Sequence, residues 1–156
     1  MLSITDQEEL TMIPVIALLL GTISARLAGF AGVDALDGWQ MSVRAGLAGM
    51  LLLTGSAHWG NRRPDLIAMV PERFPRPGLL VTLTGALELA GAAGLLISRT
   101  APYAAVGLAL LFLAMFPANI SAARRRLTLN GQPVTPLPQR TAIQALFVAA
   151  AVAAAV

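Results

Sequence analysis

Five long apolar stretches alternate with short polar segments along this chain. They lie at about residues 10–29, 43–59, 78–98, 101–119 and 140–156. An α-helix needs about 20 mostly apolar residues to cross a bilayer, and each stretch approaches that length. The first is the weakest, because Arg26 shortens its apolar part, although a long arginine side chain can extend to the membrane surface. The pattern predicts an all-α integral membrane bundle of four or five transmembrane helices.

The third apolar stretch contains one charged residue, Glu88. No other charge lies between Pro77 and Ser98. At the rise of an α-helix, Glu88 lies roughly 16 Å beyond Pro77, near the middle of a bilayer. A carboxyl group at that depth is costly and is usually paired or functional. We therefore expect the function to involve the groups that contact Glu88, although a carboxyl group that only holds helices together gives the same pattern.

Composition narrows the class of protein. Apolar residues make up 56% of the chain and charged residues only 12%, against about 25% charged residues in a soluble domain. Mean hydropathy is +0.72. The 156 residues include no cysteine and a single histidine, which excludes thiol chemistry, thiolate-bound metals and a haem held by two histidines of one copy. We expect no metal site and no covalently bound cofactor.

The basic residues are all arginines, and most lie in two loops. The first loop carries Arg62, Arg63, Arg73 and Arg76, and the second carries Arg124, Arg125, Arg126 and Arg140. Two apolar stretches separate these loops, so both loops lie on one side of the membrane. Loops rich in arginine are typically cytoplasmic. Because the charges adjoin apolar stretches, they indicate membrane topology and a lipid bilayer as partner, and we expect no nucleic-acid partner.

The two loops predict two smaller features. Prolines bracket the short apolar segment Pro64–Pro71, which predicts a short helix at the membrane surface. The pair Asn130-Gly131 in the second loop predicts a tight, hairpin-like turn.

Hydrogen-bonding side chains recur on four of the predicted helices. The candidate ligand-binding residues are Arg44, Thr54, His58, Glu88, Asn119 and Gln144. In hydrocarbon such groups turn towards each other. Following the direction of each helix, we expect a polar pocket that opens to the cytoplasm, with Glu88 at its floor.

Arg44 is the expected cationic partner of Glu88, approaching it from the external side. In such a pair Glu88 stays ionised, whereas without a partner burial favours the neutral carboxylic acid. Structural roles are the alternatives for two other candidates. His58 lies at the end of its predicted helix, where it could be an interfacial hydrogen-bonding group. Asn119 lies at the end of the next-but-one predicted helix, where it could be a helix cap.

Four sequence segments resemble the DoxX family of small bacterial membrane proteins. They read TGSAHW, MVPERFPRP, LTGALELAGAAGLL and FPANISAA. Residues that match the family pattern are Gly55, His58, Glu88, Pro117, Asn119 and Gln144. The resemblance implies a four-helix core over residues 43–156, preceded over residues 1–42 by an added transmembrane helix and an external linker. It also implies a multi-pass protein of the bacterial plasma membrane linked to redox chemistry, without implying a catalytic residue.

Three functions fit these features. The first is a membrane subunit of a redox or detoxification system that binds a quinone-like or lipid-like molecule at the polar pocket. The second is a non-catalytic scaffold or receptor for a cytoplasmic protein. Its docking residues would be Arg62, Arg63, Arg124, Arg125 and Arg126. The third is a small transporter with Glu88 as its proton or substrate site. Catalytic activity and oligomeric state stay open at this stage.

Overall fold

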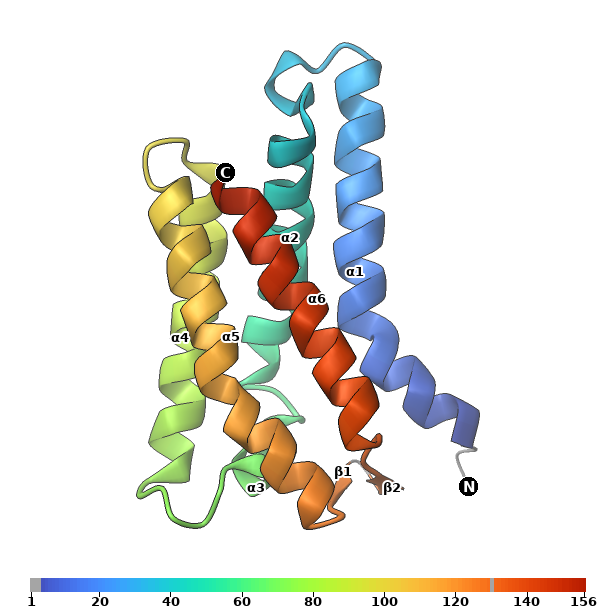
Figure 1. The fold of residues 1–156 in the computed structure, drawn as a ribbon, viewed down its shortest axis with the longest axis vertical. Helices are drawn as coiled ribbons and strands as arrows, with labels where there is room; N and C mark the ends of the chain where they lie inside the picture. The colour runs from blue at the N-terminus through green and yellow to red at the C-terminus, as the bar shows by residue number, and fades with distance from the viewer. Residues whose placement is uncertain (1–3, 130) are drawn as a thin grey trace.

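The structure, a computed structural model, describes residues 4–129 and 131–156, which are almost entirely helical (Figure 1). The elements are α1 (Ile4–Phe30), the 3₁₀-helix η1 (Asp34–Leu36), α2 (Trp39–Ala57), α3 (Arg63–Met69), α4 (Pro77–Leu96), α5 (Ala101–Arg124), β1 (Thr128–Leu129), β2 (Gln132–Pro133) and α6 (Leu137–Ala155). The prediction of an all-α fold is thus confirmed, apart from the two very short strands.

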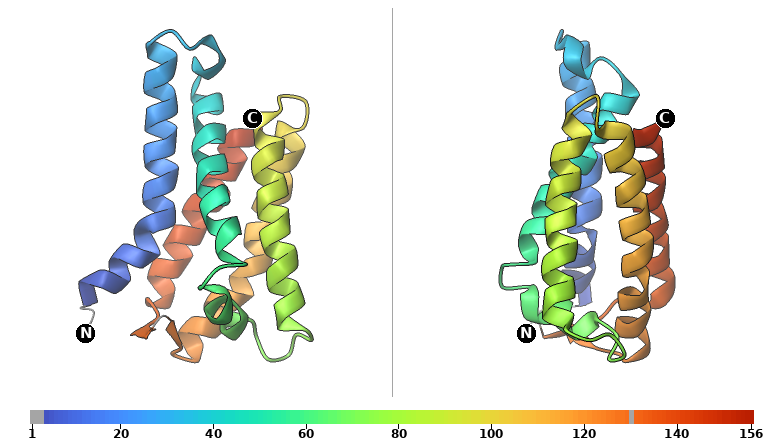
Figure 2. Two further views of the ribbon diagram at one scale, coloured as in Figure 1. Left: turned by 180° about the vertical axis from the view of Figure 1, so that it is seen from behind. Right: turned by 90° about the vertical axis from the view of Figure 1, so that its left-hand side faces the viewer.

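Five long helices form the bundle, and α2 has the most neighbours. It packs against α1, α4 and α6, while α5 packs against α4 and α6. Successive long helices run in opposite directions, so that their connections gather at two ends (Figures 1 and 2). One end holds α3 and the strand pair, and we call it the α3 end. The α1–α2 and α4–α5 connections lie at the opposite end.

Four helices are long and apolar enough to cross a membrane. The spans are Met12–Phe30, Pro77–Leu96, Ala101–Arg124 and Leu137–Ala155. The first apolar stretch, the weakest by sequence, is therefore among them. Helix α2 is not among these four, because polar residues near its start, including Gln40 and Arg44, lower its hydropathy.

The outer surface of the bundle is apolar, as a membrane protein requires. Large side chains such as Leu20 on α1, Leu87 on α4 and Leu110 on α5 are each more than half exposed. Burying apolar side chains is the main driving force for folding in water, so such an exterior fits contact with lipid rather than water. Together with the four apolar spans, it indicates a membrane protein.

The connections at the α3 end include both smaller features expected from the sequence. Helix α3 has Pro64 in its first turn, where the missing N–H of proline costs nothing. Strands β1 and β2 pair antiparallel, with Thr128 opposite Pro133, and Gly131 in the turn has a φ of +77°. This pairing fits the expected hairpin, although Asn130 itself lies outside the described residues.

Candidate functional site

A cavity of about 490 Å³ lies among the helices, between the middle of the bundle and its α3 end. We call it the Glu88 cavity. Its wall is formed by α2, α3, α4, α5 and α6, with Pro14 of α1 at one edge. Its polar lining residues are Thr54, His58, Arg62, Thr84, Glu88, Asn119, Arg140 and Gln144. Five of the six candidates from the sequence thus meet at one cavity.

Glu88 is the lining residue of α4 that lies farthest from the α3 end, and its side chain is only 4% exposed. The Thr54 hydroxyl donates a hydrogen bond to Glu88 Oε2 at 2.6 Å. His58 Nε2 lies 3.9 Å from Glu88 Oε1. Helix α2 therefore supplies both polar neighbours of this carboxyl group, from positions one helical turn apart.

The orientation of the His58 ring follows from its other nitrogen. His58 Nδ1 donates a hydrogen bond to the Thr54 carbonyl oxygen at 2.9 Å. A carbonyl oxygen only accepts hydrogen bonds, so Nδ1 carries a proton and Nε2 is the nitrogen that faces Glu88. Nε2 is a bare acceptor when His58 is neutral and a donor when it is protonated. At 3.9 Å the two groups are too far apart for a direct hydrogen bond, so each can instead offer a proton to a molecule bound between them.

Two glycines bring α2 and α4 close enough for these contacts. A Cβ atom on Gly85 would lie 2.6 Å from His58 Cβ, and a Cβ atom on Gly55 would lie 2.8 Å from Leu89 Cδ2. Both distances are too short for a real side chain. At Gly85 the clash is with the Cβ atom of His58, which cannot rotate away, so glycine is required there. At Gly55, by contrast, the flexible end of the Leu89 side chain could shift.

A second polar cluster lies nearer the cavity mouth, on α5 and α6. Arg140 Nη1 donates to Asn119 Oδ1 at 2.9 Å, and Asn119 Nδ2 donates to Gln144 Oε1 at 3.2 Å. The Gln144 amide donates in turn to the Phe112 carbonyl oxygen. The carbonyl oxygen of the next residue, Leu113, is the one that loses its backbone donor, because Pro117 has no N–H.

Sequence reasoning missed Arg140 as a site residue and assigned it to membrane topology. The available signal was its four-residue spacing from Gln144, which places both side chains on one face of α6. The rest of the cavity lining is mainly apolar. Phe112 and Phe147 pack against each other there with ring centroids 6.0 Å apart, and Met50 and Met115 also line the cavity.

A model of the family described as "Domain of unknown function (DUF8561)" matches residues 47–155. The chain belongs to the DUF8561 family. This DUF8561 region includes every polar residue of the Glu88 cavity. Neither the comparison with curated proteins nor the comparison with solved structures finds a match.

The expected pairing of Arg44 with Glu88 is wrong. Arg44 lies just before the DUF8561 region, and its Nε donates to the Ala154 carbonyl oxygen of α6 at 2.8 Å. Arg44 precedes Thr54, the partner of Glu88, by ten residues, which is about 15 Å along the helix. That separation exceeds the reach of the side chain. Arg44 instead satisfies a backbone carbonyl at the end of α6, where cations are favoured.

Two of the five arginines proposed for docking a protein form hydrogen bonds or ion pairs with other residues of the DUF8561 region. Arg63 donates to the His58 carbonyl oxygen at 2.8 Å and to the Gly78 carbonyl oxygen at 3.0 Å, which fixes the end of α2 against α4. Arg125 donates to the Ala68 carbonyl oxygen at 3.0 Å and lies 3.2 Å from Glu72.

The other three arginines are exposed and lie beside cavities. Arg62 lines the Glu88 cavity. Arg124 and Arg126 line a second cavity, also at the α3 end. The arginine-rich loops thus combine side chains that hold the bundle together with side chains that are available to a ligand.

Proposed function

We propose that this chain is a multi-pass protein of the bacterial plasma membrane, with its α3 end in the cytoplasm. The arginines at that end support this orientation, because arginine is enriched in cytoplasmic loops. We also propose that α2 is a fifth membrane span. It has 19 residues, as α6 has, and it leads from the opposite end of the bundle towards the α3 end (Figure 1). Residues 43–156 would then be a DoxX-like four-helix core, with α1 added to it.

We further propose that the Glu88 cavity binds a quinone-like lipid, as part of a redox or detoxification system. The observation that carries this proposal is the Glu88–His58 pair, 3.9 Å apart in a cavity with a mainly apolar lining. A quinone has two carbonyl oxygens that accept hydrogen bonds, and both side chains can carry a proton to donate. Phe112, Phe147 and Met50 offer apolar contacts for the ring and its hydrocarbon tail.

Reduction of a quinone to a hydroquinone adds two electrons and two protons. The electrons would come from a redox enzyme that acts as partner of this chain. Glu88 and protonated His58, 3.9 Å apart, would both lie at the same carbonyl oxygen, and one of them would give it a proton. The proton for the carbonyl oxygen on the opposite edge of the ring would come from the cytoplasmic mouth. The Thr54 hydroxyl already donates to Glu88, and it would stabilise the carboxylate once the proton has left. New protons would enter from the cytoplasmic mouth.

The two alternative functions have less support. The scaffold hypothesis has less support because Arg63 and Arg125, two of its docking residues, already donate to backbone carbonyls of the chain itself. The transporter hypothesis requires a path past Glu88 to the opposite end of the bundle. Leu47, Leu51 and Leu95 are fully buried on that side of Glu88, so a path would have to displace them.

Binding of a decyl-substituted benzoquinone to the purified chain tests the proposal. Glu88→Met keeps the length of the side chain but has no proton to donate. We expect Glu88→Met to weaken quinone binding about tenfold, the effect of losing one strong hydrogen bond. Isothermal titration calorimetry in detergent gives the dissociation constant directly.

The matched control is Glu72→Met, which makes the same change at a side chain that is 84% exposed. It should bind the quinone as the unchanged chain does. If Glu88→Met also binds as tightly as the unchanged chain, the Glu88 cavity is not the quinone site and the proposal fails. Circular dichroism of each variant establishes that the helices are intact.

A further inference from the structure

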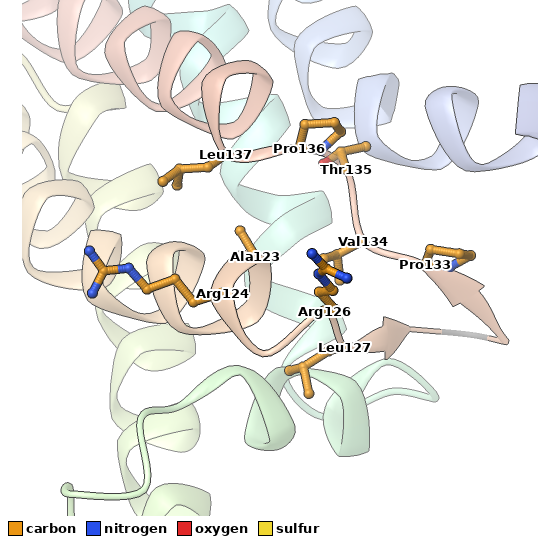
Figure 3. Close-up of a pocket in the computed structure, with 9 residues that line it drawn as sticks. All are labelled: Ala123, Arg124, Arg126, Leu127, Pro133, Val134, Thr135, Pro136 and Leu137. Atoms are coloured by element: carbon orange, nitrogen blue, oxygen red, sulfur yellow. The ribbon is translucent and has the colours of Figure 1, made fainter.

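A second cavity, of about 390 Å³, lies at the α3 end between the last turn of α5, the strand pair and the start of α6 (Figure 3). We call it the Thr135 cavity. It shares no lining residue with the Glu88 cavity. Its position, where one apolar span ends and the next begins, places it at the membrane surface of the proposed topology.

Thr135 is the most informative residue of this cavity. Its side chain is only 4% exposed, and within the described part of the chain its hydroxyl oxygen has no hydrogen-bond partner. Buried hydroxyl groups are nearly always hydrogen-bonded, because an unsatisfied one costs on the order of 1–3 kcal/mol. A buried, unpartnered hydroxyl group in a cavity wall indicates that a bound molecule supplies the partner.

Positive charge lies at the same cavity. Arg124 and Arg126 both line it. Arg126 reaches towards Val134, whereas Arg124 extends along α5 away from Val134 and Thr135 (Figure 3). Arg125, the residue between them in the sequence, binds α3 and Glu72. Arg126 therefore places a guanidinium group at the cavity, and guanidinium groups match the geometry of phosphate oxygens.

The start of α6 adds a third favourable contribution. Its first residue is Leu137, and the preceding residue, Pro136, provides no side-chain cap for the backbone N–H groups of the first turn. These groups carry the positive end of the helix dipole and favour an anion. Thr135 lies two residues before this helix start. Leu137 and Gln139 supply the N–H groups of the first turn, since Pro138 has none.

We propose that the Thr135 cavity binds the phosphate group of an anionic amphiphile. Arg126 would bind the phosphate oxygens, the Thr135 hydroxyl would donate to one of them, and the positive charge of Arg124 would add to the attraction. Leu127 and Leu137, which also line the cavity, would contact the apolar part of the ligand. A phospholipid headgroup and a soluble phosphate ester share this chemistry, and the lipid is the source that a site at the membrane surface meets most often.

Native mass spectrometry of the full chain with added phosphatidylglycerol measures this binding. We expect the double variant Arg124→Gln/Arg126→Gln to raise the apparent dissociation constant at least about tenfold, since it removes the charge-assisted hydrogen bond of Arg126 and the nearby charge of Arg124. The matched control is Arg73→Gln/Arg76→Gln, which removes two exposed arginines from the other loop at the same end. Equal losses in the two double variants would mean diffuse attraction by surface charge and would overturn the proposal.

Thr135→Val separates binding from stability. Valine has nearly the shape of threonine and lacks the hydroxyl. We expect several-fold weaker phosphatidylglycerol binding, together with an equal or higher melting temperature of the lipid-free chain, because an unsatisfied buried group is removed. Unchanged binding in Thr135→Val would overturn the assignment of this hydroxyl to the ligand, and with it the proposed site.

Two further ligands identify the source of the phosphate. Phosphatidylcholine, which has no net charge, should bind at least about tenfold more weakly than phosphatidylglycerol, and equal binding overturns the proposal. Displacement of phosphatidylglycerol by millimolar glycerol phosphate would assign the site to a soluble phosphate ester. Retention of the lipid under that competition would assign it to a membrane phospholipid.

Discussion

At the scale of single residues, Thr54 organises the floor of the Glu88 cavity. Its hydroxyl donates to Glu88 and its backbone carbonyl accepts from His58, so one residue orients both proton-carrying groups. A substitution at this position can remove the hydroxyl and its hydrogen bond to Glu88. The carbonyl contact belongs to the backbone of α2 and survives substitution.

Thr54→Val tests the hydrogen bond from the Thr54 hydroxyl to Glu88 without changing the backbone contact to His58. Valine preserves the volume but leaves Glu88 without the donor at 2.6 Å. We expect a loss of about 1 kcal/mol in the free energy of unfolding, the usual size of a side-chain hydrogen bond between membrane helices. Titration with sodium dodecyl sulfate, followed by circular dichroism, measures it. Thr141→Val is the control, because the exposed Thr141 hydroxyl binds only a carbonyl of its own helix.

At the scale of helices, glycines determine which pairs pack closely. Helix α1 makes most of its contacts with α2, and Gly21 and Gly46 lie at that crossing. A Cβ atom on Gly46 would lie 2.6 Å from the Thr22 backbone nitrogen and 2.7 Å from the Leu18 carbonyl oxygen. Backbone atoms cannot rotate away as side chains do, so α1 would have to move as a whole.

Gly46→Ala should therefore separate α1 from α2. We expect a loss of about 1–3 kcal/mol in the free energy of unfolding, as for other overpacked contacts. Gly49→Ala, on the same helix, is the control because no atom lies within 4 Å of its added Cβ. That change should leave stability equal or raise it by up to about 1 kcal/mol, since alanine favours helices. If both variants have the same stability, the α1–α2 crossing is looser than the distances indicate.

At the scale of the whole molecule, hydropathy was sufficient to predict the long helices, because lipid demands continuous apolar stretches. The expected span at about residues 78–98 corresponds to Pro77–Leu96. The meeting of Thr54, His58 and Glu88 also followed from depth and helical spacing. The pairing of side chains with backbone groups of other helices could not be predicted from the sequence. Arg44 and Ala154, for example, are 110 residues apart in the sequence. Only the packing of α2 against α6 brings them together.

The number of membrane crossings is a property of the whole chain, and α2 decides it. If α2 crosses, the α1–α2 connection and the α2–α4 connection lie on opposite sides of the membrane. The chain has no cysteine, so single cysteines can be introduced without background labelling. Asp34→Cys and Asn61→Cys place exposed thiols in these two connections.

We expect an impermeant maleimide added to intact cells to label Asp34→Cys and to leave Asn61→Cys unlabelled until the membrane is opened. Ser98→Cys, in the exposed α4–α5 connection, should behave as Asp34→Cys does, because both connections lie at the end opposite α3 (Figure 2). Labelling of Asp34→Cys and Asn61→Cys from the same side would contradict a crossing by α2. The arginine-rich loops would be external instead of cytoplasmic if Asn61→Cys alone reacted in intact cells, and the Glu88 cavity would then open away from any cytoplasmic redox partner.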